Sequence, residues 1–365
     1  MLHVYKDVYP PVAGGIEKHI DVLRRHMPEV RSDVLVCSGS RHTSRRPTSH
    51  GEEIKVGELG RLLAVPVAPT FPFHLVRQRP DVVHLHMPYP LGELSAILVG
   101  RGVRVVVSYH ADIVRQAALE PIYRPFLRWW FRRAAAVIVG SHRLVETSPY
   151  LDGLDDRIDV VPYGVDTQLI ARGRAAGAKA AKIRARFGTP LILTVGRLVS
   201  YKGYENLVAA AHELHASLIS VGVGPLEGEL KDQALGDNRI HFVGAVSDED
   251  LPAYLRAADV FALPSTTRAE SFGIATLEAQ ALGVPAVITD VGTGTIEAVD
   301  PGLTGLVVPP GDVQALRDAL QRLLSDPAGR ARMGRAAAAR VERDRTAAHQ
   351  AARVLEIYRR VVSTP

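Results

Sequence analysis

Short runs of β-branched and other aliphatic residues alternate with helix-length segments along most of this chain. Parallel strands need a long crossover, usually a helix, so such alternation is typical of parallel βα units. The runs form two series. The first lies at 34–36, 82–85, 103–107, 137–139 and 158–161, and the second at 191–195, 218–221, 240–243, 260–263, 286–289 and 305–308. The sequence therefore predicts an α/β fold with two Rossmann-like, doubly wound sheets.

The length of the chain favours two domains. It has 365 residues, whereas a single hydrophobic core stops growing at about 250–300 residues. Between the two series, residues 166–188 lack a strand pattern and are rich in Ala, Gly, Arg and Lys, which indicates a connector leading into a basic helix. We expect an N-terminal domain at 1–170, a C-terminal domain at 171–345, and a C-terminal helix at 346–365 that packs back on the N-terminal domain.

The charge balance excludes little by itself. A formal net charge of +5 is compatible with nucleic acid, an anionic membrane or a phosphate-bearing ligand. The sequence contains no recognised nucleic-acid-binding motif or dense basic tract, so nucleic acid is not expected as a partner. It also contains no secretion signal at its start and no apolar run long enough to span a membrane. We expect a cytoplasmic protein, either free or peripheral on the inner face of the membrane.

Two cations follow the first strand of the second series. Arg197 comes directly after Gly196, and Lys202 lies five residues further, before Gly203. Arginine offers a planar fork of donors and lysine a point charge, so together they suit a diphosphate and the charge that builds on a departing nucleotide. The alternative is ordinary solvated loop charge.

Two carboxylates surround a helix start after the strand at 260–263. Glu270 precedes the helix, Ser271 to Ile274 can direct backbone N–H groups at phosphate oxygens, and Glu278 is expected about two turns into the helix. There Glu278 is placed to accept hydrogen bonds from a ribose diol. This arrangement predicts a nucleotide-diphosphate site with one carboxylate left for a transferred group.

With these motifs in this order, the chain resembles the family 4 glycosyltransferases, retaining enzymes of the GT-B fold with two domains facing across a cleft. The resemblance covers nearly the whole chain and is carried by Gly196-Arg197 with Lys202-Gly203, by Glu270-Ser271-Phe272-Gly273 through Leu277-Glu278-Ala279, and by Gly283-Val284-Pro285. It implies that the C-terminal domain binds a nucleotide sugar and the N-terminal domain lies on the acceptor side. It also implies that Arg197 and Lys202 grip the diphosphate, Glu278 holds the ribose and Glu270 contacts the donor sugar.

Three further segments match this family's donor site. The spacing of the turn Val221 to Gly228 is wrong for a dinucleotide fingerprint. The family carries a similar turn beside its donor site, so the resemblance implies a supporting role for this turn and for Gly224 in it. Val246, after a strand, resembles the backbone contact to the nucleobase. Near the N-terminus, Gly14 and Gly15 open a helix and let the backbone approach the donor phosphate. The expected donor-binding residues are Gly14, Gly15, Arg197, Lys202, Gly224, Val246, Glu270, Ser271, Phe272, Gly273, Ile274 and Glu278.

A histidine is the fourth expected catalytic group, beside Arg197, Lys202 and Glu270. His110 follows a strand where the family places a histidine facing the transferred sugar, although a structural histidine is the alternative. We interpret His84 and His86 as structural, because the sequence shows no matching set of metal ligands. The acidic run 248–250, behind Ser247, is expected to form the first turn of a capped helix. No metal or other cofactor is expected to be required.

The sequence specifies the acceptor less closely than the donor. The helix at 124–133 contains arginines and both tryptophans, which favours either an anionic membrane surface or packing of its aromatic residues on the first sheet. Segments 3–7 and 109–116 resemble mannosyl- and rhamnosyltransferases of surface-polysaccharide assembly. That similarity favours GDP-mannose as donor and a glycan or lipid-linked acceptor, with a UDP-hexose as the alternative donor. A nicotinamide-dependent oxidoreductase is a further alternative, but the first βα unit has no dinucleotide glycine spacing.

Overall fold

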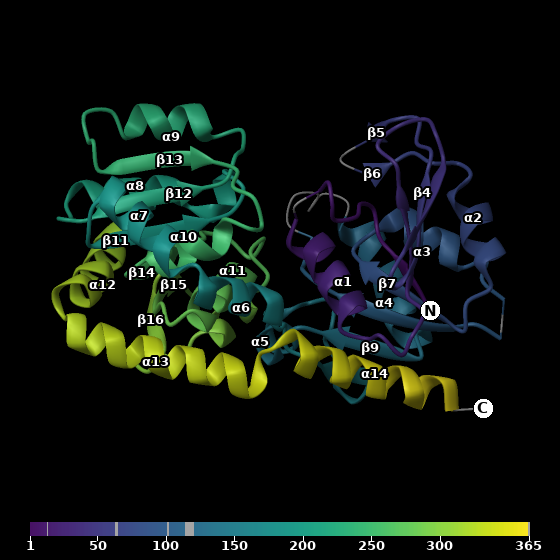
Figure 1. Cartoon of the computed structure of the whole chain (residues 1–365). Coiled ribbons are helices and arrows are strands. Elements are labelled where there is room, and N and C mark those ends of the chain that lie inside the picture. The colour runs from purple at the N-terminus through teal and green to yellow at the C-terminus, as the bar shows by residue number, and fades with distance from the viewer. Residues whose placement is uncertain (13, 63–64, 101, 114–119, 364–365) are drawn as a thin grey trace. The chain divides into compact units, whose positions relative to one another are not determined.

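The computed structural model describes residues 1–12, 14–62, 65–100, 102–113 and 120–363. The chain divides into two compact units (Figure 1). One unit contains Met1–Tyr163 together with the C-terminal segment from Ala347, and the other contains Gly164–Thr346. The chain therefore passes from one unit to the other twice, after Tyr163 and after Thr346.

The first unit is built on an eight-stranded sheet in the order β10-β9-β8-β7-β1-β2-β4-β3. Neighbouring strands are parallel except for β3 and β4, which form an antiparallel edge. A separate short hairpin consists of β5 and β6. The strands are β1 Leu2–Val4, β2 Asp33–Cys37, β3 Ser44–Thr48, β4 Gly51–Val56, β5 Arg61–Leu62, β6 Val65–Pro66, β7 Val82–Met87, β8 Arg104–Tyr109, β9 Ala136–Val139 and β10 Ile158–Val160.

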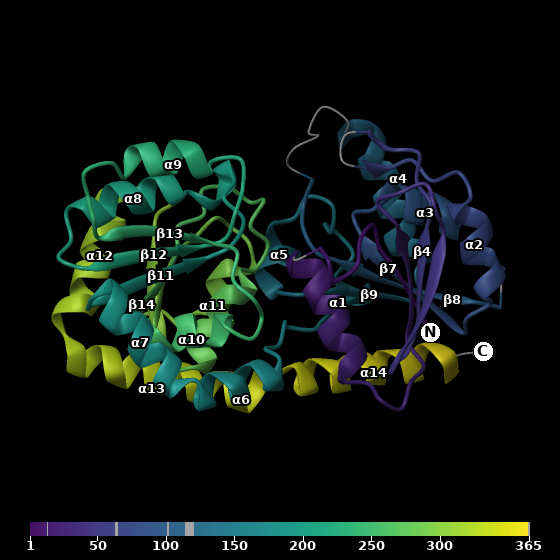
Figure 2. The ribbon, with the colours of Figure 1, turned by 45° about the horizontal axis from the view of Figure 1, so that its top comes forward.

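Helices cover both faces of this sheet. Val106 and Val107 are neighbours on β8 and point to opposite faces, as alternation along a strand requires. Val107 packs in a cluster with Trp130 of α4, whereas Val106 packs with Leu23 of α1 and Val354 of α14; α1 and α14 contact each other (Figure 2). The helices are α1 Gly15–Arg25, α2 Phe71–Gln78, α3 Pro90–Ala96, α4 Glu120–Arg133, α5 His142–Thr147 and α14 Ala347–Ser363, with a 3₁₀ turn at Asp155–Arg157.

The basic and aromatic segment expected at 124–133 lies in α4. Leu127, Trp130 and Phe131 are fully buried in the core of the first unit. Trp129 is 40% exposed, and the Arg133 guanidinium lies 5.4 Å from its ring centre. The buried side of α4 therefore packs its aromatic residues into the core of the first unit, as one of the two alternatives predicts. The exposed side keeps an aromatic residue beside a cation, so contact with a membrane stays a prediction.

The second unit contains a six-stranded, fully parallel sheet in the order β13-β12-β11-β14-β15-β16. Helices α6 and α7 occupy the segment interpreted as a connector, and the Asp166 side chain caps α6 by accepting from the Gln168 N–H at 3.0 Å. The strands are β11 Leu191–Val195, β12 Ser217–Val221, β13 Ile240–Gly244, β14 Val260–Leu263, β15 Ala286–Thr289 and β16 Gly305–Val308. The helices are α6 Thr167–Ala175, α7 Gly177–Phe187, α8 Tyr204–His212, α9 Glu227–Gln233, α10 Leu251–Ala257, α11 Ile274–Ala281, α12 Val313–Ser325 and α13 Pro327–Asp344, with 3₁₀ turns η3 Ser200–Lys202 and η4 Gly294–Ala298.

Candidate functional site

The strand order of the second unit reverses between β11 and β14. From β11 the chain continues outward to β12 and β13, and from β14 it continues the other way to β15 and β16. In open α/β sheets, ligands bind beyond the carboxyl ends of the strands at such a reversal, because the connections leave a crevice there. The loops that follow β11 and β14 are therefore the candidate site.

These two loops are in direct backbone contact. The Thr266 N–H donates to the Tyr201 carbonyl at 2.8 Å. Gly203 has φ 65°, and a Cβ there would clash with the Pro264 carbonyl, so only glycine permits both the left-handed backbone and the close approach. Gly203 thus holds the two loops together.

Each loop contributes one side chain to a buried ion pair. Lys202 Nζ lies 2.5 Å from Glu270 Oε2, and their side chains are 13% and 9% exposed. The Ser265 hydroxyl donates to the same Oε2 at 3.2 Å, and the Thr293 hydroxyl donates to the Glu270 backbone carbonyl at 2.6 Å. Two expected catalytic residues from different loops therefore meet in one fixed arrangement.

The environment of Lys202 keeps it charged. Burial disfavours the ammonium and by itself lowers the pKa of Lys202, but attraction to Glu270 and the hydrogen bond to that carboxylate outweigh it, so the pKa is raised above its usual value. Lys202 is consequently a fixed cation at the switch point. An anionic ligand that enters the crevice meets this cation beside a carboxylate.

The loop after β14 ends at the start of α11. Gly273 is the N-cap residue, with φ 76°, and a Cβ there would clash with the Leu263 side chain. Within the described chain, no side chain caps this helix end, and the first N–H groups of a helix have no partner inside it. Such an end favours an anion. Phe272 is buried, so its side chain packs inside the unit and does not face a ligand.

Glu278 lies closer to the helix start than expected. Because α11 begins at Ile274, Glu278 is about one turn into the helix and not two. Its side chain is half-buried, as are Ser271 and Ile274. The structure therefore places Glu278 on the same helix end as the backbone groups of Ser271 to Ile274.

The glycine-rich turn after β12 supports the loop that carries Arg197. Leu198 N–H donates to the Val223 carbonyl at 3.0 Å, and a Cβ at Gly224 would clash with the Leu198 backbone. Arg197 is exposed, and Val246 is half-buried just beyond β13. These residues follow β11, β12 and β13, so they lie along the same sheet edge as the ion pair.

The acidic run after β13 forms a turn ahead of a helix. The helix α10 begins at Leu251, later than expected, so residues 248–250 precede it. The Ser247 hydroxyl accepts from the Asp250 N–H at 3.1 Å, and Lys179 Nζ lies 2.9 Å from Asp250 Oδ1. Asp250, and not Ser247, is the N-cap residue of α10, and in the part of the chain that the structure describes it has no side-chain cap; it is engaged in the turn with Ser247 and in the ion pair.

The expected glycine turn of the first unit lies at the start of α1. Gly14 is the N-cap residue and Gly15 the first helical residue. The Glu17 carboxylate folds back over Gly14, where a Cβ would clash with it, whereas the space around Gly15 is open. Ala13 of this motif lies outside the described residues, as do Val114 to Gln116 of the second resembling segment.

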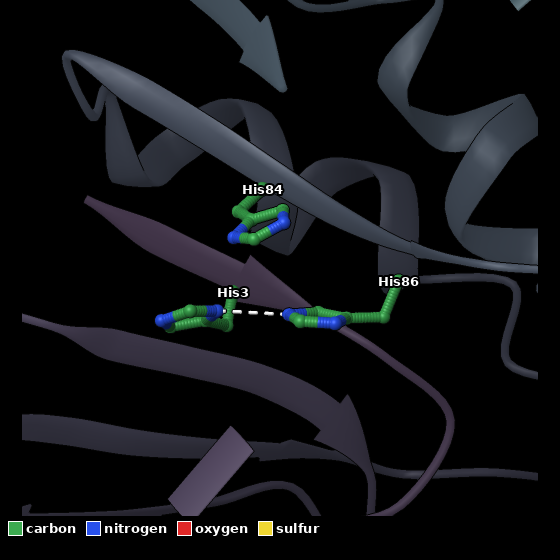
Figure 3. Close-up of side chains that lie close together, drawn as sticks. All are labelled: His3, His84 and His86. Atoms are coloured by element: carbon green, nitrogen blue, oxygen red, sulfur yellow. Dashed lines mark hydrogen bonds between the residues drawn. The ribbon is translucent and has the colours of Figure 1, made fainter. Parts of the chain in front are cut away.

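His110 lies within a line of hydrogen-bonded rings that we call the ring chain, formed by His3, His86, His110 and Tyr163. His3 Nδ1 lies 2.9 Å from His86 Nε2 (Figure 3), His86 Nδ1 lies 2.9 Å from His110 Nε2, and His110 Nδ1 lies 2.7 Å from the Tyr163 hydroxyl. His110 is 3% exposed. Both of its nitrogens are engaged inside the first unit. The sequence did not predict His3 and Tyr163 as its neighbours.

One ring nitrogen from each of His3, His84 and His86 lies close enough to the other two to be a candidate ligand of a single metal ion. The His84 and His86 rings stack at 4.4 Å with 29° between their planes (Figure 3). Imidazole lone pairs lie in the ring plane, so stacked rings do not direct them at one point. His84 also uses both nitrogens, at 2.5 Å from the Tyr358 hydroxyl and 2.7 Å from the Ser108 hydroxyl. This geometry fits a hydrogen-bond network better than a metal site.

Comparison with known proteins places this geometry among sugar-transferring enzymes. Residues 178–340 match the family described as Glycosyl transferases group 1, and residues 13–169 match Glycosyltransferase Family 4. The chain is 33% identical over 347 residues to the D-rhamnosyltransferase WbpZ of Pseudomonas aeruginosa, which covers 93% of this chain and 90% of WbpZ. It is 28% identical over 364 residues to O-antigen chain mannosyltransferase C of Escherichia coli, covering 98% and 97% of the two chains.

A third relative is the GDP-mannose-dependent monoacylated alpha-(1-6)-phosphatidylinositol monomannoside mannosyltransferase of Corynebacterium glutamicum, 30% identical over 352 residues, with 92% and 91% of the two chains covered. Among solved structures, sucrose-phosphate synthase from Thermosynechococcus elongatus superposes with a TM-score of 0.81 at 23% identity, over 100% of this chain and 99% of that chain. The structural likeness shows a shared fold.

Proposed function

This chain is a member of glycosyltransferase family 4 with the GT-B fold, and from that premise we propose that it moves a mannose-type hexose from GDP-mannose to a glycan or lipid-linked acceptor, with retention of configuration. The observation that carries the proposal is the buried Lys202–Glu270 pair at the switch point of the second sheet. The mannose-type donor is supported by the relatives, which are named as rhamnosyl- and mannosyltransferases.

The donor diphosphate is proposed to bind across the loops after β11 and β14. Lys202 supplies a fixed charge, the exposed Arg197 a fork of donors, and the start of α11 its N–H groups. As the bond to the sugar breaks, negative charge grows on the departing diphosphate. Groups already aimed at that charge stabilise the transition state more than the ground state.

Glu270 is proposed to position the transferred sugar and not to attack it. One carboxylate oxygen is held by Lys202 and Ser265, so it is a hydrogen-bond acceptor with a fixed direction and a weak nucleophile. A retaining reaction without a covalent intermediate then requires the acceptor to enter on the face that the diphosphate leaves. Glu278 is proposed to hold the ribose, and the backbone at Val246 to contact the base.

No divalent metal is included in this proposal. Two cations, Arg197 and Lys202, are available to neutralise the diphosphate, and the carboxylate of Asp250 is engaged with Lys179. The lipid-linked acceptor is supported by the exposed Trp129 and Arg133 on α4. No helix in the described ranges is both long and apolar enough to cross a bilayer.

Removal of either member of the pair tests the proposal. Lys202→Ala and Glu270→Ala are expected to lower donor turnover by about 10²–10³-fold, the usual effect of losing one transition-state contact. Lys179→Ala is the matched control, because it removes a lysine from an exposed ion pair elsewhere in the same unit. Release of nucleotide diphosphate is measured with folding checked by circular dichroism. Full turnover in a folded Lys202→Ala or Glu270→Ala variant would overturn the assigned role.

A further inference from the structure

The histidines of the ring chain are placed by the alternation of side chains along three neighbouring parallel strands, β1, β7 and β8. His84 and His86 lie two residues apart on β7, and Ser108 and His110 follow the same alternation along β8 and just beyond it, with His86 in register with Ser108. His3 on β1 is in register with His84. All of these side chains therefore lie on one face of the first sheet, the face covered by α1 and α14.

The rings of the chain lie nearly in one plane, end to end. The interplanar angle is 28° between His3 and His86, 9° between His86 and His110, and 27° between His110 and Tyr163, with ring centres 5.2, 5.2 and 6.1 Å apart. At these separations, the contacts of 2.9 Å between ring nitrogens and of 2.7 Å from His110 Nδ1 to the Tyr163 hydroxyl are in-plane hydrogen bonds that link each ring to the next.

The rings of the ring chain are uncharged. Burial lowers the pKa of His3, His86 and His110 well below the usual value, so each imidazole carries a single N–H near neutral pH. A neutral imidazole is a donor at one nitrogen and an acceptor at the other. The chain therefore has only two directions, with every N–H pointing toward Tyr163 or every N–H pointing toward His3.

The two ends of the ring chain favour one direction, because the Tyr163 hydroxyl hydrogen can rotate to another acceptor whereas an N–H on His3 Nε2 is fixed in its ring. His3 Nε2 is buried and finds no hydrogen-bond partner among the residues that the structure describes. If the N–H groups pointed toward His3, a buried N–H would be left unsatisfied, which is rarer and costlier than an unsatisfied acceptor. The favoured direction has His3 Nδ1–H donating to His86, His86 Nδ1–H donating to His110, and His110 Nδ1–H donating to the Tyr163 oxygen.

We propose that His86 and His3 are positioning residues, which hold His110 as the neutral Nδ1–H tautomer and aim its N–H along the chain toward Tyr163. The bond from His86 occupies His110 Nε2, so the proton of His110 is confined to Nδ1. His110 then offers its Nδ1–H hydrogen bond to the Tyr163 hydroxyl. It does not act as a proton-transferring acid.

Neighbouring residues keep the rings aligned. His19 of α1 packs edge-on at 5.6 Å from the His110 ring centre and 5.1 Å from that of Tyr163. A Cβ at Gly140, just after β9, would clash with the Tyr163 ring, so Tyr163 lies directly on this glycine. Contacts with His19 and Gly140 therefore hold Tyr163, the last residue of the ring chain, in place.

The tautomer is measured directly. Protein with ¹⁵N-labelled histidine gives long-range ¹H–¹⁵N spectra that distinguish Nδ1–H from Nε2–H in each ring, with His110 assigned by the loss of its signals in His110→Gln. We expect His110 to be the Nδ1–H tautomer at neutral pH. If His110 of the unsubstituted protein is instead the Nε2–H tautomer, or is charged, the inference is wrong.

A matched pair of variants tests the role of His86. His86→Phe keeps a ring and removes both hydrogen bonds, whereas His84→Phe does the same two residues away on the same face but outside the chain. We expect His86→Phe to shift His110 toward the Nε2–H tautomer or a mixture, and His84→Phe to leave it unchanged. An unchanged tautomer in folded His86→Phe, or an equal change in His84→Phe, would refute the positioning role.

The effect on turnover rests on the proposed function. There, His86→Phe is expected to lower kcat more than it raises KM, by about 10-fold or more, because an aimed hydrogen bond matters most in the transition state. The spectra test the ring chain and the turnover tests the proposed function, so either test can fail without the other. The expected tautomer with no turnover of any nucleotide sugar would contradict only the proposed function, and turnover with the other tautomer would contradict only the ring chain.

Discussion

Acid is expected to unfold the first unit before the second. Five histidines of the first unit are at most 8% exposed: His3, His19, His84, His86 and His110. Burial lowers the pKa of His19 to about 4 and that of His84 to about 3, and lowers the other three well below the usual value. Below pH 6.5 the unfolded chain therefore binds protons that the folded unit does not, and stability falls as the pH falls.

The size of this loss follows from the number of buried rings. Between pH 7.5 and pH 5.5, one histidine that stays neutral in the folded state and has a pKa of about 6.5 when unfolded lowers the free energy of unfolding by about 1.4 kcal/mol. Five such rings give about 7 kcal/mol. A domain has about 5–15 kcal/mol in total. The first unit is thus expected to lose roughly half or more of its stability by pH 5.5.

Urea unfolding followed by hydrogen exchange and mass spectrometry measures each unit separately. The second unit has only His212, His215 and His241, so its stability should change far less. His19→Phe should reduce the loss by about 1.4 kcal/mol, whereas His42→Phe, at an exposed position, should not. A change of less than about 2 kcal/mol in the first unit, well below the summed effect of five rings, would refute the reasoning.

Three further predictions concern the second unit. Lys202→Met alone should lower the free energy of unfolding by about 3–5 kcal/mol, because it leaves Glu270 buried and unpaired. The double variant Lys202→Met with Glu270→Leu should recover most of the stability but no turnover. Equal melting temperatures of the single and double variants would contradict this prediction. Gly203→Ala should cost at least about 1–2 kcal/mol and lower turnover, because its φ of 65° and the Pro264 carbonyl exclude a Cβ; an unchanged melt and rate would show that the loops tolerate the substitution. EDTA should leave nucleotide release unchanged, and recovery of a lost activity by Mg²⁺ or Mn²⁺ would contradict the metal-independent proposal.

Much of the second sheet is visible in the sequence because its inner strands β11, β12, β14 and β15 are buried on both faces. Such strands read as unbroken aliphatic runs, and the predicted runs agree closely with β11 to β16. In the first unit, β3 and β4 at the sheet edge carry arginines and glutamates and were not predicted. β1 has only three residues, with a histidine in the middle. Edge position and short length remove the apolar signal in these strands.

The candidate site shows the same limit. The placement of Lys202 and Glu270 after strands was predictable, but their pairing required the order of β11 and β14 in the sheet, which the sequence does not contain. Glu278 was placed a turn too deep, because the left-handed Gly273 delays the start of α11. The ring chain joins residues 3, 86, 110 and 163, and only the strand register brings them together.

The central claim is that the second unit binds a GDP-linked mannose-type donor for transfer. Incubation of the full chain with a panel of nucleotide sugars, followed by measurement of released nucleoside diphosphate, tests it most directly. We predict that GDP-mannose gives the fastest release, and that Lys202→Ala lowers that release by about 10²–10³-fold. Release from a UDP-hexose but not from GDP-mannose would contradict the proposed donor, and binding of NAD without release from any nucleotide sugar would contradict the proposed reaction.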